Sequence, residues 1–433
     1  GVMMGSHEGT KTRRNNWETI PLRYVCELNP SVNFEGFEED DELTFLPMDR
    51  VKSGYFLPNA DKFLKYASSY NAFEEGDIVL AKVTPCFENG NIAVAQNLEG
   101  GKGFGSSELF VIRPKKVNRK FLFYYFQSSA FKQEGEASMT GAGGLKRVSP
   151  DLLRQHHLPC PDGETQRLIA DYLDRETARI DALVAEKEKM LALLEEKRAA
   201  LISRAVTRGL DPTAPLKPSG LDWLGDIPAH WGTPPVYARF DVQLGKMLDE
   251  KKIKGTHLAP YLRNVDVQWG KINTSSLPEM DFDDESRIRY SLQPGDVLVC
   301  EGGEIGRSAI WFGEIAECYY QKALHRLRPL NGHDDASYFV YVMQTLVNLC
   351  VFSSQANAAT IQHLPAEKLR TVRYPAPPIH EQREIVSFLN RETAYLKKMN
   401  GEITHSIQLL KERRAALITA AVTGQIPVEE MRP

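Results

Sequence analysis

The stretch that decides the fold is Pro159–Gly209, PCPDGETQRLIADYLDRETARIDALVAEKEKMLALLEEKRAALISRAVTRG, because the chain contains it twice. The second copy, Pro375–Gln425, aligns at a constant offset of 216 without a gap, and 22 of the 51 paired positions are identical. The identities concentrate in a P-x-P entry, then Q-R-x-I, R-E-T-A and E-x-R-A-A-L-I-x-x-A-V-T. A repeat at a fixed offset indicates a duplicated structural unit.

Each copy has the pattern of a long helix. Apolar residues recur at steps of mostly three, four or seven, which is typical of a coiled-coil seam. Pro159 and Pro161 favour an extended entry, Asp162 or Thr165 can cap the first helix, and Gly209 ends it. Roughly 40 residues at about 1.5 Å each predict a rod of roughly 60 Å. The predicted seam comprises Ile169, Leu173, Ile180, Leu191, Leu194, Leu201, Ile385, Leu389, Leu396, Ile407, Leu410 and Leu417.

The segment before each rod has a different pattern: short apolar runs separated by Gly, Pro and Asn, which indicate β-strands. G-D-I-V-L-A at Gly76 has a counterpart in G-D-V-L-V-C at Gly295, and L-F-V-I-R-P at Leu109 has one in L-H-R-L-R-P at Leu324. One helix is expected over residues 121–133 and a matching one over 338–349, with a short helical turn over 150–154.

These patterns predict an α+β protein with an internal pseudo-twofold repeat: two globular domains separated by two long antiparallel coiled-coil helices. A spacer of roughly 60 Å equals somewhat under two turns of duplex DNA, at about 3.4 Å per base pair. The expected divisions are a disordered or expression-derived N-terminus at 1–16, domains at 17–158 and 220–374, helices at 159–209 and 375–425, a linker at 210–219 and a tail at 426–433.

Composition limits the classes of protein to consider. The net charge is −4, 42% of the residues are hydrophobic, and no apolar run is long enough for a membrane span. The six cysteines are scattered, so we expect a reduced, cytoplasmic protein. His156, His157 and Cys160 lie close together in sequence, but no second cluster supplies further ligands, and we predict no metal site.

Catalytic motifs are not recognisable. Thr233-Pro234-Pro235-Val236 lacks the polar and aromatic residues of an amino-methyltransferase element, and no phosphate-binding G-x-x-x-x-G-K-[ST] occurs. Glu195-Glu196-Lys197 lies on a predicted rod, where a charge run is usually solvated. We therefore expect a non-catalytic chain that binds no cofactor.

Recognition is the remaining interpretation. Both domains place polar and basic residues in turns between strands, and such side chains contact phosphates or base edges in DNA complexes, although they are equally common on ordinary surface loops. A Gly-rich loop at 140–144 and a loop at 357–363 precede the two rods. The candidate DNA-binding residues are Arg50, Lys82, Thr84, Asn89, Ser106, Ser107, Thr140, Lys146 and Arg147 in the first domain, and Lys246, Arg263, Asn264, Arg307, Gln321, Lys322, Thr360 and Gln362 in the second.

From about Trp17 to Gln425 the chain resembles the specificity subunit of type I restriction-modification systems. The most specific matches are Q-R-x-I and R-E-T-A at 166–178 and 382–394, with the closing K-R-A-A-L-I and R-R-A-A-L-I segments. The linker S-G-L-D-W-L-G-D-I-P-A-H-W at 219–231 also looks like the opening of that family's second half. The first copy departs by having Thr165 where the second has Glu381.

The resemblance implies that each globular domain is a target recognition domain that reads one half of a bipartite site in double-stranded DNA. It also implies that the paired helices set the gap and dock two methyltransferase subunits, which carry S-adenosylmethionine and modify adenine at N6. Motor-endonuclease subunits can join such a complex. Two alternatives stay open at this point: a duplicated coiled-coil scaffold whose heads bind proteins, and a self-contained methyltransferase or nuclease.

Overall fold

The computed structural model describes residues 17–63, 69–142, 144–247, 255–352 and 363–433. These residues form two compact units: residues of 1–188 together with 404–433, and residues 189–403. The division passes through both long helices, so each unit contains one globular head and one part of each helix. We refer to the described residues of 17–158 as the first head and those of 220–374 as the second head.

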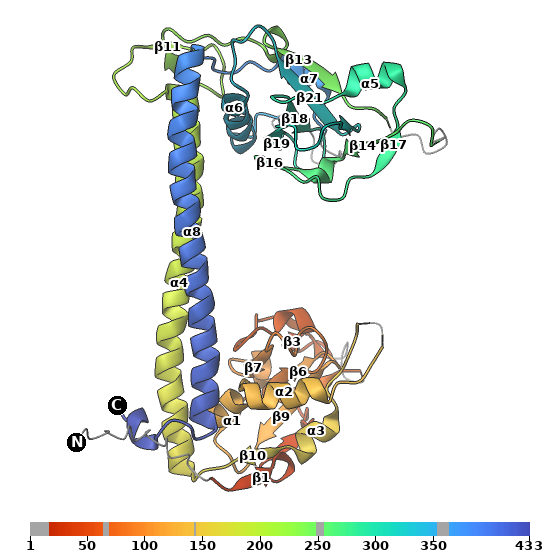
Figure 1. Ribbon diagram of the computed structural model, residues 1–433. Helices are drawn as coiled ribbons and strands as arrows, with labels where there is room; N and C mark the ends of the chain where they lie inside the picture. Colours follow the sequence, from red (N-terminus) through yellow and green to blue (C-terminus); the bar gives the residue numbers. More distant parts are fainter. Residues whose placement is uncertain (1–16, 64–68, 143, 248–254, 353–362) are drawn as a thin grey trace, which may run out of the picture. The chain divides into compact units, whose positions relative to one another are not determined.

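The two repeated segments are the long helices α4 (Gly163–Arg208) and α8 (Ile379–Val422). They pack side by side within each unit (Figure 1). In the first unit Arg414 pairs with Asp181 and Lys411 with Glu188, and in the second the Asn400 amide donates to Glu195. Residue numbers rise along one helix as they fall along the other, which confirms the predicted antiparallel pairing.

Of the two residues expected to cap the start of α4, Asp162 and Thr165, the structure shows Asp162 in this role. The carboxylate of Asp162 accepts hydrogen bonds from the backbone N–H groups of Glu164 and Thr165, each at 3.0 Å. These bonds hold the pKa of the Asp162 carboxyl below its usual value. Thr165 is not the cap, although its hydroxyl also donates to Asp162.

The predicted seam residues are buried or half-buried in the structure, although they do not all serve the helix pair. Ile169 and Leu173 belong to the hydrophobic core of the first head, and Ile385 and Leu389 belong to that of the second. The opposite end of each helix contributes as well, through Ile202 to the second core and Ile418 to the first. Each head therefore shares its core with both helices.

The first head contains two four-stranded sheets with the strand orders β2-β9-β6-β7 and β4-β3-β8-β5. Its strands are β2 (Cys26–Leu28), β3 (Glu42–Leu46), β4 (Ala60–Lys62), β5 (Asn71–Glu74), β6 (Ile78–Ala81), β7 (Ile92–Val94), β8 (Lys102–Gly105) and β9 (Leu109–Pro114). A short ribbon of β1 (Thr19–Pro21) and β10 (His157–Pro159) joins the two ends of the head. Its helices are α1 (Arg119–Phe126), α2 (Ser129–Ala137) and α3 (Pro150–Gln155).

The second head repeats this topology with the strand orders β13-β21-β18-β19 and β17-β14-β20. The sheet β4-β3-β8-β5 and its three-stranded counterpart β17-β14-β20 each include one parallel pair, β3 with β8 and β14 with β20. The strands are β13 (Phe240–Leu244), β14 (Leu258–Leu262), β17 (Glu279–Asp281), β18 (Val297–Cys300), β19 (Ser308–Ile310), β20 (Tyr319–Tyr320) and β21 (Leu324–Pro329), with the ribbons β11 (Leu216–Pro218)–β12 (Asp226–Pro228) and β15 (Val267–Gln268)–β16 (Lys271–Ile272). The helices are α5 (Asp284–Tyr290), α6 (Ala336–Asn348) and α7 (Ala366–Thr371).

One helix prediction was wrong. The expected single helix over 121–133 is two helices, because Ser128 interrupts it and caps α2 by accepting from the backbone N–H of Phe131. The matching prediction in the second head is confirmed by the single helix α6, and the short turn over 150–154 is confirmed by α3.

The repeated G-D motif has a structural role in both heads. Gly76 and Gly295 adopt positive φ angles of 92° and 96°, which favour glycine. The next residue is an aspartate that is 1% exposed and pairs through two hydrogen bonds with the arginine of the R-P motif: Asp77 with Arg113, and Asp296 with Arg328. The two sequence motifs therefore meet in each head as one ion pair whose carboxylate is buried.

Candidate nucleic-acid interface

In the first head, the loop after β6 meets the loop between α2 and α3. The backbone N–H of Thr84 donates to the Lys146 carbonyl at 2.9 Å, and Val148 donates to Lys82 at 2.8 Å. Thr140 pairs with Arg147 through two backbone hydrogen bonds. The structure therefore brings five predicted residues together: Lys82, Thr84, Thr140, Lys146 and Arg147.

The loop before β9 joins this cluster through an acidic residue that we did not predict. Glu108 accepts two hydrogen bonds from the Arg147 guanidinium, at 2.8 and 2.9 Å. This pairing lowers the pKa of Glu108 and raises that of Arg147. Ser106 accepts from the backbone N–H of Glu108, and Ser107 is exposed beside it. Arg147 is thus neutralised, while the exposed Lys146 forms no ion pair with any residue described.

Two further predicted residues of the first head, Asn89 and Arg50, lie on different loops. Asn89 is exposed in the loop after β6. Arg50 donates to the Pro58 carbonyl at 3.1 Å, which holds it on the neighbouring 48–58 loop. That loop is joined to β7, because Ile92 donates to the Lys52 carbonyl and Gly54 donates to that of Ile92.

The second head gathers its predicted residues at the equivalent ends of its strands. Lys246 donates its backbone N–H to Tyr320 and accepts from that of Lys322 at 2.8 Å, while Gln321 donates to Leu262. The Lys246 ammonium donates to the Asp281 carbonyl and the Ser286 hydroxyl. It also lies 4.9 Å from the ring centroid of Phe282, so it is anchored, whereas Lys322 is exposed.

A second group in this head joins Asn264 to Arg307. The Arg307 guanidinium donates to the Asn264 carbonyl at 2.9 Å, and the Asn264 amide donates to the Gly302 carbonyl. Two polar atoms here are buried and have no partner among the described residues, the Asn264 Oδ1 and the Arg307 Nε. Arg263 is neutralised by two hydrogen bonds to Asp266, which raise its pKa.

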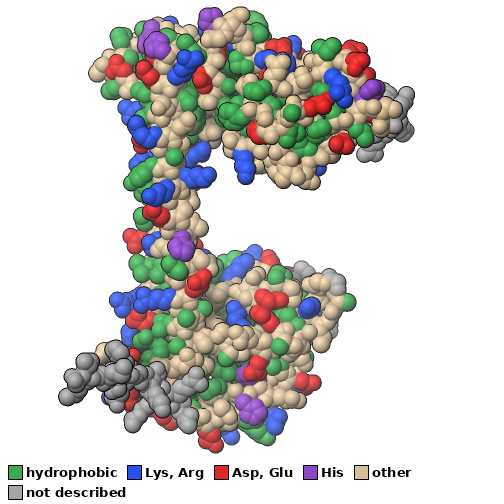
Figure 2. Space-filling model, viewed as in Figure 1, with side chains coloured by type: hydrophobic (Ala, Val, Ile, Leu, Met, Phe, Trp, Pro, Cys, Tyr) green, Lys and Arg blue, Asp and Glu red, His purple; other side chains and the backbone are tan. Residues whose placement is uncertain are grey.

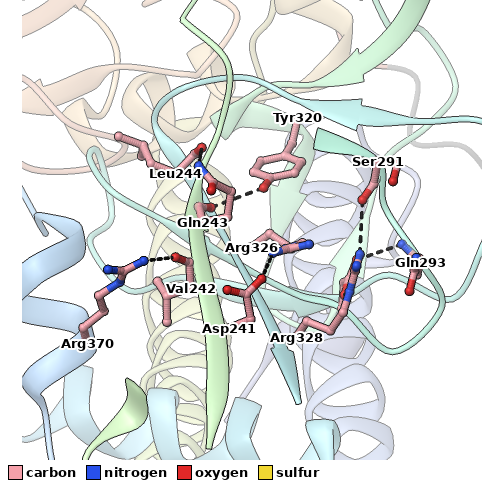
Figure 3. Close-up of polar contacts among 11 residues, drawn as sticks. Asp241, Val242, Gln243, Leu244, Ser291, Gln293, Tyr320, Arg326, Arg328 and Arg370 are labelled. Carbon is pink, nitrogen blue, oxygen red and sulfur yellow. Dashed lines mark hydrogen bonds and ion pairs between the residues drawn. The ribbon is translucent and has the colours of Figure 1, made fainter. Parts of the chain in front are cut away.

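Other arginines of the second head are occupied within the fold (Figure 3). Arg326 pairs with Asp241, Arg328 donates to the Ser291 carbonyl as well as to Asp296, and Arg370 donates to the Val242 carbonyl at 2.6 Å. Counting arginines therefore overstates the positive charge that a ligand can meet. In the view of Figure 2, Lys and Arg side chains are interspersed with Asp and Glu on the described surface of each head.

Sequence reasoning missed the residues that neutralise the candidate cations. Glu108 lies 39 positions from Arg147, and no local pattern joins them. Asp266 lies three positions from Arg263, and that spacing could have indicated the pair. Val265, which lies between Asn264 and Asp266, is 64% exposed and was also missed. Thr360 and Gln362 lie outside the described residues, as do residues 1–16.

Two residues of the sequence cluster His156, His157 and Cys160 contact other side chains of the protein. His156 is buried, with one ring nitrogen 2.7 Å from the Tyr125 hydroxyl and the other 2.6 Å from a carboxylate oxygen of Glu134. Cys160 lies 3.4 Å from the amide nitrogen of Gln166. Among the residues that the structure describes, no helix combines the length and apolar character that a membrane span requires.

Comparisons with known proteins agree with this organisation. A family model described as the type I restriction modification DNA specificity domain matches residues 14–192 and 240–408. The type I restriction enzyme EcoAI specificity subunit of Escherichia coli is 34% identical over 160 residues, covering 36% of this chain, and the EcoEI specificity subunit is 30% identical over 200 residues, covering 42%. The matched part spans only 27% and 33% of those two proteins. The EcoKI specificity subunit of Escherichia coli K12 is 18% identical over 431 residues, covering 95% of this chain and 90% of that protein.

Two solved structures share the fold. A chain from a structure that addresses complex assembly and conformational transition of the type I R-M system matches with a TM-score of 0.73 and 18% identity, covering 96% of this chain and all of that one. The HsdS subunit from Thermoanaerobacter tengcongensis matches with a TM-score of 0.51 and 18% identity, covering 95% and 97%. Because the family model covers both heads and most of both long helices, the chain belongs to the type I restriction modification DNA specificity domain family.

Proposed function

We propose that this chain is the DNA sequence-recognition subunit of a type I restriction-modification complex, in which each head reads one half of a bipartite site. The observation that carries the proposal is that in each head the loop after one central strand meets the loop before the next, and the two heads line these loops with different side chains. The backbone N–H of Lys82 donates to the Glu108 carbonyl, and that of Glu301 donates to the Ala323 carbonyl. Ser106 and Ser107 precede β9, whereas Gln321 and Lys322 precede β21. A common scaffold with divergent polar loops suits two different half-sites.

We also propose that the two long helices set the gap between half-sites and dock two methyltransferase subunits. The support comes from Leu193 and Leu409, which are equivalent and identical in the repeat yet are 61% and 51% exposed. An apolar side chain this exposed contributes little to the fold. Its presence in both copies is consistent with one kind of partner that binds twice.

Catalysis and S-adenosylmethionine binding are assigned by this proposal to the methyltransferase subunits, which modify adenine at N6. Motor-endonuclease subunits complete the restriction form of the complex, and the assembly acts in the cytoplasm. The acidic net charge of −4 fits a chain that leaves most phosphate contacts to its partners.

The decisive experiment maps methylated adenines in a host that carries this chain with its methyltransferase partner. We expect a single bipartite motif with a fixed gap, and no methylation when either protein is omitted. A gel-shift titration at fixed salt should show specific binding only when the partner is present. Equal, non-specific binding with and without the partner would contradict the proposal.

The docking part has its own test. Leu193→Glu or Leu409→Glu should reduce the number of bound methyltransferase subunits from two to one, as measured by mass photometry. Met190→Glu is the matched control, because Met190 is 43% exposed and is replaced by Ser406 in the other copy. Two bound subunits in both leucine variants would exclude this surface.

A further inference from the structure

The duplication allows each contact between the long helices to be compared with its equivalent. In the first unit, Arg414 donates to both carboxylate oxygens of Asp181, at 2.9 and 3.3 Å. The offset of 216 makes Arg198 equivalent to Arg414, and Lys397 equivalent to Asp181. In the second unit the ion pair is therefore replaced by two cations.

These two cations line a crevice of about 540 Å³ between α4 and α8. Its other lining residues are Leu194, Glu195, Asn390, Thr393, Ala394, Leu396 and Asn400. Neither Arg198 nor Lys397 forms an ion pair with a described residue. Glu195 is the one acidic lining residue, and it accepts from the Asn400 amide at 3.3 Å. Two cations and one carboxylate leave the crevice positively charged.

The crevice also adjoins the second head. The Tyr341 hydroxyl, from helix α6, donates to the Asn390 Oδ1 at 2.7 Å. Because this oxygen is the acceptor, the Asn390 amide nitrogen is a donor that can face the crevice. The α4 residues that line the crevice are Leu194, Glu195 and Arg198, so the excess positive charge of the crevice comes from Lys397 on α8.

We propose that this crevice binds a phosphate of the DNA backbone in the gap between the two half-sites. Two like charges at one place repel each other unless an anion lies between them, and a phosphate accepts hydrogen bonds from Arg, Lys and amide donors together. The inference rests on the proposed function and extends it from the heads to the spacer.

The asymmetry of the repeat favours DNA over a protein partner. A methyltransferase that docks on both copies needs the same residues in each, and the exposed leucines meet that condition. The crevice does not, because its equivalent in the first unit contains the Arg414–Asp181 ion pair. A ligand that contacts one copy only is better matched by the DNA backbone, whose phosphates contact the protein without carrying sequence information.

The test uses the whole complex with its methyltransferase subunits and the substitution Lys397→Asp, which copies the ion pair of the first unit. The replacement removes a repulsion, so the Tm should not fall. Affinity is measured across a salt series for a duplex carrying the mapped target and for an unrelated duplex of equal length. The slope of log K against log salt should decrease by about 1 to 2, since each phosphate contact contributes about 0.9. The ratio of specific to non-specific affinity should stay within about twofold.

Lys398→Asp is the matched control, because Lys398 is adjacent, makes the same charge change and does not line the crevice. A wild-type slope in Lys397→Asp, or an equal decrease in both variants, would overturn the phosphate site. Weaker methyltransferase binding with an unchanged slope would show that an acidic protein segment occupies the crevice, and would also overturn it. If the wild-type complex does not distinguish the two duplexes, the proposed function itself fails, whatever the variants show.

Discussion

At the scale of single residues, the glutamine of the Q-R-x-I motif explains why the repeat is preserved at that position. Gln382 is fully buried, and its amide donates to the Pro377 and His333 carbonyls while its oxygen accepts from the Asp335 backbone N–H at 2.8 Å. Gln166 makes the equivalent contacts with the Pro161 carbonyl and the Asn118 backbone N–H. Asn118 and Asp335 cap the first helix after β9 and β21 respectively. This glutamine is thus an equivalent contact between each long helix and its head, in addition to the shared hydrophobic core.

Removing this tie should destabilise the second unit. Gln382→Ala leaves several buried backbone groups without a partner, which should lower the free energy of unfolding by about 2–3 kcal/mol. Urea unfolding followed by tryptophan fluorescence is a suitable measurement, because four of the five tryptophans lie within residues 189–403. The neighbouring Arg383→Ala, on the exposed face, is the control and should change the stability by no more than about 0.5 kcal/mol. Equal stability of the two variants would refute this role.

A second residue-scale prediction concerns acid sensitivity. His325 is fully buried in β21, and burial lowers the pKa of its imidazole below the ordinary 6.5. As pH falls through 6.5 the unfolded chain takes up a proton that the folded chain does not, so the folded state loses stability. His325→Gln keeps a donor for the Leu364 carbonyl and should show a smaller drop in Tm between about pH 7.5 and about pH 5.5.

The exposed His257→Gln in the same unit is the control for that measurement. It should retain the acid sensitivity of the wild-type chain, because it leaves the buried His325 in place. Identical pH dependence in the wild-type chain and His325→Gln would show that His325 does not contribute.

At the scale of elements, the periodicity of apolar residues predicted the long helices and the central strands. It did not predict which side chains pair with one another between distant parts of the chain. The G-D and R-P motifs were visible as repeats, but their meeting as the Asp77–Arg113 ion pair depends on the pairing of β6 with β9. Ser128 carried a local capping signal that was overlooked, which is why one helix was predicted where two exist. The neutralisation of Arg147 by Glu108 required the folded loops and could not be read from spacing.

The antiparallel register of the long helices gives a prediction about the gap. Glu188 and Lys411 lie at the same level of the helix pair, because their side chains form an ion pair. Inserting one apolar-patterned heptad after each residue lengthens both helices by about 10 Å. The gap in the methylated motif should increase by about three base pairs on straight DNA, with both half-sites unchanged.

A heptad inserted after Pro212, in the linker, is the control because it adds the same length of chain outside the helices. The methylated motif should then keep its original gap. If the helix insertions leave the gap unchanged as well, the helices do not set the spacing.

At the scale of the whole chain, two heads of one topology on two nearly matched helices predict independent half-sites. Replacing residues 17–157 with the corresponding head of another family member should alter one half-site of the methylated motif and leave the other as it was. Methylome sequencing measures this directly. A change in both half-sites after the replacement would show that the heads do not read DNA separately.

The glutamine tie also bears on how such a chain can evolve. Gln166 and Gln382 receive a backbone N–H from the head, so the contact requires a helix start at that place and no specific side chain. The sequence of a head can therefore change without loss of its hydrogen bond to this glutamine. The same holds when a whole head is acquired by recombination within the repeated helix segments. On the proposed function, one such exchange would give the chain a new DNA target while the helix surface proposed to dock the methyltransferase subunits stays unchanged.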